Sequence, residues 1–326
     1  MARSVRGGQR SVTDKMELEL DILLQQIING LVQGSVYALV ALGYTMVYGI
    51  LGLINFAHGE VVMVGAMVAL AATQLLASYG LPPILVLLVG LMAAIAVCMA
   101  LGYTIERIAY RPLRNAPRLA PLITAIGVSI VLQNLAMLFW GREYHAFPSL
   151  LPNSPHIVAG AIINEVQIAI VLVALLMMGG LLLLVHRTRL GRAMRAVAEN
   201  PSAAALMGVN INAVISTTFM LGSALAAVAG IMVSANYGIV HYYMGSILGL
   251  KAFTAAVLGG IGNLRGAMLG GVLLGLIESL GAGYIGDLSG GFLGSHYQDV
   301  FAFFVLIAVL VLRPSGLLGE RVAERA

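Results

Sequence analysis

Hydrophobic positions in this chain gather in long runs that are separated by short polar stretches. Such runs occur at residues 22–48, 61–79, 84–105, 119–140, 166–185, 211–235, 246–258, 266–277 and 298–312. A helix needs roughly 20 apolar residues to cross a bilayer core about 30 Å thick, and most of these runs are long enough. The pattern predicts an all-α fold, a polytopic integral membrane helical bundle with about eight to nine transmembrane helices.

Two regions interrupt this pattern with glycines. The short runs at 246–258 and 266–277 flank a cluster of glycines, and the stretch 49–60 places Asn55 and His58 between glycines. Short hydrophobic segments interrupted by glycine are typical of discontinuous helices in transporter cores. We therefore expect re-entrant or broken segments at both places.

Basic residues are concentrated in three short stretches between or after the apolar runs. They are Arg107, Arg111, Arg114 and Arg118, then Arg187, Arg189, Arg192 and Arg195, and finally Arg313, Arg321 and Arg325. By the positive-inside rule all three stretches should face the cytoplasm, whereas the segment 141–165, which has one arginine, should face outward. The side of the N-terminal tail stays open, because one of the three runs before Arg107 could be a re-entrant hairpin.

The same pattern predicts the domain organisation. We expect a polar N-terminal tail at 1–20, a single transmembrane domain at 21–319 and a cytoplasmic tail at 320–326. Within the domain, 187–210 would be a cytoplasmic loop and 141–165 an extracytoplasmic one. The first 20 residues contain no apolar stretch of the kind found in a cleavable signal peptide.

Composition indicates a membrane protein rather than a water-soluble enzyme. Of the 326 residues, 60% are hydrophobic and 10% are charged, whereas about 25% of a soluble domain is charged. The net charge of +4 comes from loops that the positive-inside rule explains, so we expect no nucleic acid partner. The single cysteine, Cys98, lies within an apolar run and is expected to serve helix packing.

The sequence contains none of the common catalytic or nucleotide-binding motifs. A P-loop needs a lysine before Ser or Thr, but the two lysines of the chain, Lys15 and Lys251, precede Met16 and Ala252. The zinc motif H-E-x-x-H and the nucleophile elbow G-x-S-x-G are absent from the sequence as well. We therefore expect no catalytic residue, no metal and no cofactor, and any energy from ATP would have to come from another chain.

The basic stretch 187–210 has the pattern of two short helices joined at a break. Asn200 and Pro201 are typical of a helix start, and Gly208 is typical of a helix end. Helices this short are marginal in water, so a partner surface would hold them, and the small side chains at 203–205 suit a groove. The alternative is an ordinary basic loop fixed by membrane topology alone, and spacing does not decide between the two.

Polar residues within or beside the apolar runs are candidates for a translocation pathway. They are Asn29, Gln33, Tyr44, Asn55, His58, Glu60, Lys251 and Asn263. Polar groups at membrane depth are costly, so they usually face a cavity or one another. Each could instead be satisfied inside the bundle or lie near a helix end. Asn55 and His58 stand out, because the freed backbone groups of a broken helix can line a polar route.

Long motifs throughout the chain resemble one family of transporters. These motifs lie at 26–30, 43–50, 54–60, 105–114, 199–208 and 251–262. They are similar to the motifs of permeases in the branched-chain amino acid ATP-binding-cassette (ABC) importers, and most of all to the H-type subunit. The likeness runs in register from about residue 25 to residue 319, although the tail before residue 20 is longer than the family leads us to expect.

The resemblance implies a permease for leucine, isoleucine and valine that acts within a larger assembly in a bacterial inner membrane. A second, unlike permease of the M type would complete the pathway, two ABC ATPase subunits would dock beneath it, and an extracytoplasmic binding protein would deliver the substrate. The segment 187–210 would then be the coupling loop that receives the movement of the ATPases. The residues implied in that role are Gly191, Arg192, Arg195, Ala198, Glu199, Asn200, Pro201, Ala203, Ala204 and Gly208.

Other functions remain open on the sequence. A permease for urea, short-chain amides or other amino acids would share the fold, because specificity lies largely in the external binding protein. An ion-coupled secondary transporter would need an acidic relay within the membrane, and Glu278 is the plausible interior carboxylate. A membrane enzyme is disfavoured by the missing catalytic motifs.

Overall fold

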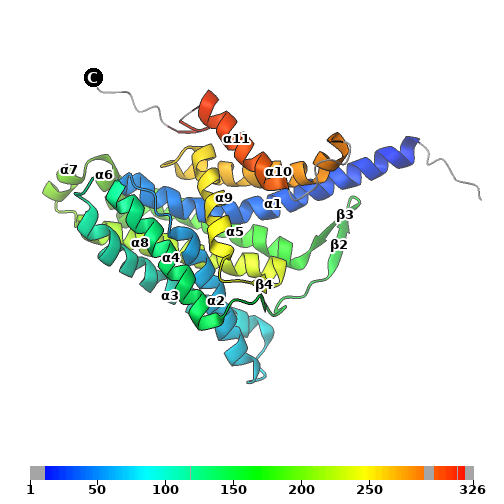
Figure 1. Cartoon of the computed structure of the whole chain (residues 1–326), viewed down its shortest axis with the longest axis horizontal. Coiled ribbons are helices and arrows are strands. Elements are labelled where there is room, and N and C mark those ends of the chain that lie inside the picture. The colour runs from blue at the N-terminus through cyan, green and yellow to red at the C-terminus, as the bar shows by residue number, and fades with distance from the viewer. Residues whose placement is uncertain (1–11, 118, 290–296, 314, 320–326) are drawn as a thin grey trace, which may run out of the picture.

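The chain folds into a bundle of helices with two small sheets beside it (Figure 1). The computed structural model describes residues 12–117, 119–289, 297–313 and 315–319. Its helices are α1 (Val12–Leu51), α2 (His58–Ala77), α3 (Pro83–Thr104), the π-helix η1 (Ile105–Tyr110), the 3₁₀-helix η2 (Arg111–Leu113), α4 (Leu119–Trp140), α5 (Glu165–Arg187), α6 (Arg189–Glu199), α7 (Pro201–Leu206), α8 (Ile211–Tyr237), α9 (Met244–Gly259), α10 (Leu264–Leu288) and α11 (Gln298–Leu312). Strands β1 (His145–Ala146) and β4 (Ile239–Val240) pair antiparallel, as do β2 (Pro155–Val158) and β3 (Ala161–Asn164).

The predicted polytopic membrane bundle is confirmed. Among the described residues, seven helices are long and apolar enough to cross a membrane: α1, α2, α3 with its continuation through η2, α4, α5, α8 and α10. Two shorter apolar helices, α9 and α11, accompany them. Sixteen residues in α9 extend for about 24 Å at 1.5 Å per residue, somewhat less than the hydrocarbon core.

Helix α1 is the longest element of the described chain. Its 40 residues extend for about 60 Å, roughly twice the thickness of the hydrocarbon core. Residues 12–20 of the predicted polar tail form its first turns, so this part of the tail is helical. Residues 1–11 and the predicted cytoplasmic tail 320–326 lie outside the described residues.

Both predicted helix breaks are present, and they are neighbours in space. Residues 52–57 separate α1 from α2, and residues 260–263 separate α9 from α10. A Cβ built on Gly49 would lie 3.6 Å from the carbonyl oxygen of Gly262, so the chain beside one break touches the other. The run 266–277 is not a short segment, however, because α10 continues for 25 residues through Glu278. Donors from other helices converge on one oxygen of this carboxylate and stabilise its charge within the bundle, so the charge does not end the helix.

Contacts between distant segments settle which loops share a side of the membrane. The Arg114 guanidinium donates to the Asn212 amide oxygen at 2.7 Å, which places the first basic stretch beside the end of the second. On the opposite side, Gln25 exchanges two hydrogen bonds with the backbone of Ile162 in β3, at 2.8 and 3.0 Å. The N-terminal end of α1 therefore lies on the side of the 141–165 segment. If the basic stretches face the cytoplasm, as the positive-inside rule predicts, that side is the outside.

Glycines allow α1 and α10 to pack with their backbones in contact, and the two helices run side by side over much of their length (Figure 1). A Cβ built on Gly34 would lie 2.8 Å from the Cα of Val272 and 2.9 Å from the carbonyl oxygen of Gly271. Such close approach through small residues is a main source of helix association in lipid, where apolar side chains gain little by leaving the acyl chains. The packing of α1 against α10 therefore depends on residues without a side chain.

We predict that Gly34→Ala destabilises the protein. The added methyl group meets backbone atoms, which cannot rotate away, and overpacking of this kind costs about 1–3 kcal/mol. Gly179→Ala in α5 is the matched control, because a Cβ there meets nothing within 4 Å and alanine is the better helix former. Thermal unfolding of the purified protein in detergent should show a lower midpoint for Gly34→Ala alone. Equal midpoints would contradict the proposed packing.

We also predict that the start of α1 is reached from outside the cell. Single cysteines would be introduced in a Cys98→Ala background, which removes the only native thiol. A membrane-impermeant maleimide should label Glu19→Cys and Ser154→Cys in intact cells, whereas Ser202→Cys should react only after the membrane is opened. Labelling of position 19 only after opening would place the N-terminus inside and refute the topology.

Candidate functional site

The segment 187–210 folds as two short helices, α6 and α7, each with a capped start. The Thr188 hydroxyl accepts a hydrogen bond from the Gly191 amide at 3.1 Å, and the Asn200 side chain accepts one from the Ala203 amide at 3.0 Å. Pro201 occupies the first turn of α7, and Gly208 follows that helix with a φ of 81°. Asn200, Pro201 and Gly208 hold the cap, proline and glycine positions predicted from the sequence, whereas the Thr188 cap of α6 was not predicted.

Helix α6 is anchored to the membrane domain. Gly191, Met194 and Val197 are buried, so one face of α6 packs against the bundle. The Arg195 guanidinium donates to the carbonyl oxygen of Val185, near the end of α5. Arg195 is therefore a contact within the chain. Of the remaining expected coupling residues on α6, Arg192, Ala198 and Glu199 are exposed.

Helix α7 instead presents apolar side chains to its surroundings. Leu206 is 89% exposed and Met207 is 85% exposed at its C-terminal end, whereas Ala204 is buried. Pro201 and Ala203 are exposed as well. Leu206 and Met207 were not among the residues predicted from the sequence. The available signal was two large apolar residues directly before the helix-ending Gly208, on the basic side of the membrane.

The eight pathway candidates do not converge on one site. Gln33 and Lys251 meet at the buried carboxylate of Glu278, which accepts from Gln33 Nε2 at 3.0 Å, from the Tyr37 hydroxyl at 2.7 Å and from Lys251 Nζ at 3.2 Å. Lys251 Nζ also lies 2.6 Å from Asp299, whose side chain is 42% exposed. We call these residues the Glu278 cluster. Tyr37 and Asp299 were missed, because nothing local in the sequence brings α1 and α11 to α10.

Asn29 lies beside this cluster, one helical turn before Gln33 on α1. Its side-chain oxygen accepts a hydrogen bond from Gln25 Nε2 at 3.1 Å. Asn29 and Gln33 are both partly buried, in contrast to the completely buried side chain of Glu278. Asn29 therefore continues the row of polar side chains along α1 from the Glu278 cluster towards the outer end.

A second group gathers Tyr44, His58 and Glu60, which are all buried. The rings of Tyr44 and His58 meet edge to face with centroids 4.9 Å apart. Glu60 Oε1 accepts from Gln133 Nε2 at 2.6 Å and from the Ser129 hydroxyl at 3.2 Å, both on α4. This group joins α1, α2 and α4 at the level where α2 begins.

The two remaining candidates, Asn55 and Asn263, lie in the helix breaks. The Asn55 side-chain oxygen accepts from the Ala57 amide at 3.2 Å and from the Tyr110 hydroxyl at 3.1 Å. The Asn263 oxygen accepts from the Gly266 amide at 3.1 Å and so caps the start of α10, while its amide donates to the carbonyl of Leu318 at 2.8 Å. Local structure accounts for Asn263 without a role in transport.

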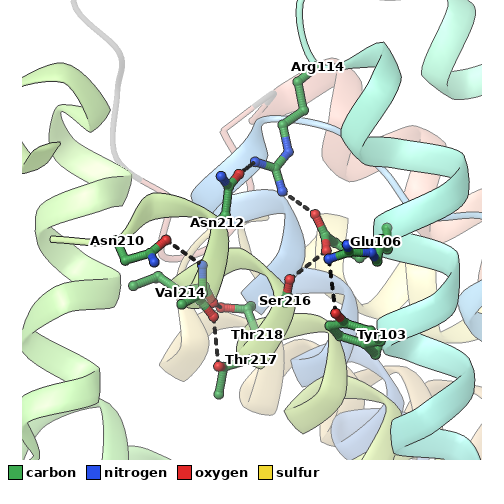
Figure 2. Close-up of polar contacts among 11 residues, drawn as sticks. Tyr103, Glu106, Arg114, Asn210, Asn212, Val214, Ser216, Thr217 and Thr218 are labelled. Atoms are coloured by element: carbon green, nitrogen blue, oxygen red, sulfur yellow. Dashed lines mark hydrogen bonds and ion pairs between the residues drawn. The ribbon is translucent and has the colours of Figure 1, made fainter.

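A further polar group, not expected from the sequence, joins the C-terminal end of α3 to the start of α8. Figure 2 shows the carboxylate of Glu106, on the π-helix η1, between Arg114 and Ser216. The completely buried carboxylate accepts from the Arg114 guanidinium and, at 2.5 Å, from the Ser216 hydroxyl. Arg114 also binds Asn212, as described above, so it links both helices.

Comparison with known proteins identifies the family. The family described as "Branched-chain amino acid transport system / permease component" matches residues 26–310. The chain is 50% identical to the high-affinity branched-chain amino acid transport system permease protein BraD of Pseudomonas aeruginosa over 307 residues, which cover 93% of this chain and 97% of BraD. It is 46% identical to the corresponding protein LivH of Escherichia coli over 308 residues, with the same coverage.

A more distant relative has the same extent. The probable branched-chain amino acid transport permease protein LivH of Methanocaldococcus jannaschii is 30% identical over 305 residues, or 92% of this chain and 94% of that protein. No solved structure matches the chain. Because the family match and the alignments with BraD and LivH extend over nearly the whole length, this chain belongs to the family of branched-chain amino acid transport system permeases.

Proposed function

We propose that this chain is the H-type permease of an ABC importer for leucine, isoleucine and valine in a bacterial inner membrane. It would act with an unlike M-type permease, two ATPase subunits and an extracytoplasmic binding protein. Relatives named for branched-chain amino acid transport favour this substrate class over urea or amides. The sequence carries no P-loop, so as a transport subunit it would depend on ATP hydrolysis by its partners.

The exposed end of α7 is the observation that carries the proposal. Two large apolar side chains, Leu206 and Met207, stand on a two-turn helix whose neighbour α6 is anchored in the bundle. An apolar anchor of this kind suits a pocket on another protein. On the cytoplasmic side of an importer, the partner that must be contacted is the ATPase. The proposed docking surface comprises α7 with the exposed α6 residues Arg192, Ala198 and Glu199.

For the substrate route we propose the face that carries Asn29, Gln33 and Lys251. The supporting feature is Asp299 in the first turn of α11 beside Lys251, because a carboxylate that is 42% exposed faces water or protein rather than acyl chains. A face of this kind would border the route or the second permease. Tyr44, Asn55, His58 and Glu60 are buried here and would reach the route only after α1 and α2 move apart.

The transport proposal is tested with the complete importer in proteoliposomes. Uptake of labelled leucine, isoleucine and valine should require ATP on the ATPase side, the loaded binding protein on the other side and an intact Walker lysine in the ATPase. Replacing that lysine should abolish uptake, since this chain supplies no nucleotide site of its own. Uptake by the chain without any ATPase would contradict the proposal.

Docking through α7 is tested by Leu206→Ser. Loss of a central apolar anchor typically weakens an interface by about tenfold or more, so co-purification of the ATPase with the permease should fall accordingly. Leu119→Ser is the matched control, because Leu119 is a 67%-exposed leucine at the start of α4 and belongs to neither α6 nor α7. Equal ATPase recovery from both variants would exclude α7 as the main anchor.

A further inference from the structure

Three hydrogen bonds make α7 and the start of α8 a single unit. The Val209 amide donates to the carbonyl of Ala204 at 3.0 Å, which folds the chain back onto α7. The Asn210 side chain accepts from the Ala213 amide at 3.1 Å, and the Asn210 carbonyl accepts from the Val214 amide, so Asn210 caps α8. A displacement of α7 would therefore displace the first turn of α8.

The Glu106–Arg114 pair connects this first turn of α8 to α3. Arg114 holds Asn212, and Glu106 holds Ser216 one turn further along α8, so two points of α8 are fixed (Figure 2). The carboxylate of the pair is shielded from water, because the Glu106 side chain is 0% exposed, whereas the Arg114 side chain is 17% exposed. Close by, a Cβ built on Gly102 would lie 2.9 Å from the carbonyl of Phe219, so the two backbones touch. The ends of α3 and α8 are thus joined by hydrogen bonds to charged side chains and by contact between their backbones.

The same π-helix reaches the break between α1 and α2. The Tyr110 hydroxyl donates to the Asn55 side chain at 3.1 Å and lies 3.3 Å from the carbonyl of Ile54, while its ring packs on Phe219. Glu106 and Tyr110 both belong to η1, which holds α8 at one end and the break at the other. Single π-helical turns inside longer helices are uncommon and are found frequently at functional sites.

We propose that Glu106, Arg114 and Tyr110 are positioning residues for ATP-driven transport. They transmit displacement of α7 through α8 and η1 to the break at 52–57, where α1 and α2 separate. This inference rests on the proposed function, and it assigns none of the three residues a contact with substrate. Its alternative is that the same contacts only stabilise the fold, which would affect assembly and hydrolysis as much as uptake.

The test uses two variants that leave the buried ion pair in place. Asn212→Ala removes the contact from α8 to Arg114, and Tyr110→Phe removes the contact to Asn55 while keeping the ring on Phe219. In the complete importer, ATP hydrolysis stimulated by leucine-loaded binding protein should stay near the unmodified level. Leucine uptake per ATP hydrolysed should fall roughly threefold to tenfold in each variant, the size expected for one lost hydrogen bond. The double variant should fall no further than the lower single variant, because both contacts belong to one route.

Two control variants remove hydrogen bonds that do not cross between helices. Tyr103→Phe removes the contact with Arg107, one turn away on the same helical stretch, and Thr217→Val removes a bond to the Ala213 carbonyl within α8. Both should keep the unmodified ratio of uptake to hydrolysis. The proposal is overturned if uptake and hydrolysis fall in parallel, if the ratio does not change, or if the double variant multiplies the two effects. Failure of the proposed function looks different, since the unmodified importer would then show no ATP-dependent leucine uptake.

Discussion

A lipid bilayer offers no hydrogen-bond partners, so the polar groups that this chain carries into it must be satisfied within the protein. Three buried carboxylates collect donors from other parts of the chain: Glu278 Oε2 from α1 and α9, Glu60 Oε1 from α4, and both oxygens of Glu106 from α8 and Arg114. Leaving such a group without partners in the hydrocarbon costs several kcal/mol, which is comparable with the whole stability of many proteins. The positions of these carboxylates therefore restrict how the helices can be arranged.

Glycine contacts and polar contacts restrict that arrangement in different ways. Glycines such as Gly34 and Gly271 set how closely α1 and α10 approach, but a row of small residues permits sliding by one turn. The hydrogen bonds from Gln33 and Tyr37 to Glu278 allow one register only. The hydrogen bond from Gln133 to Glu60 links α4 to α2 in the same way, and the hydrogen bond from Ser216 to Glu106 links α8 to the end of α3. The break at 52–57 separates α1 from α2, and the hydrogen bond from Tyr110 to Asn55 ties it to η1.

Local chemistry made part of this structure predictable from sequence. Asn200, Pro201 and Gly208 define α7 because capping, a fixed φ and a positive φ act over a few residues. Glycines likewise revealed both helix breaks, and runs of apolar residues revealed the spans. The predicted length of the segment 266–277 was wrong, because the local sequence shows an apolar run that ends before Glu278. Helix α10 continues past Glu278, since side chains distant in sequence donate hydrogen bonds to its carboxylate.

Pairings across the chain could not be predicted from periodicity. Tyr37 and Glu278 are 241 residues apart, and Ser216 and Glu106 are 110 residues apart, so no window along the sequence contains either pair. The side of the N-terminus likewise needed the contact between Gln25 and Ile162 in three dimensions. The pathway candidates were ordinary polar residues in apolar runs, and only the fold separates Asn263, a helix cap, from Lys251 in a charged cluster.

The buried pair of Glu106 and Arg114 is difficult to explain by stability alone. Removing two charges from water is costly, and well-packed apolar residues in place of such a pair are often as stabilising or more so. An apolar contact, however, would allow α3 and α8 to shift against each other, whereas the bonds from Arg114 to Asn212 and from Ser216 to Glu106 fix their relative position. A transporter that must convey a displacement from an exposed helix into the membrane gains from that rigidity. The pair is therefore better understood as a fixed connection between the ends of α3 and α8 than as a source of folding energy.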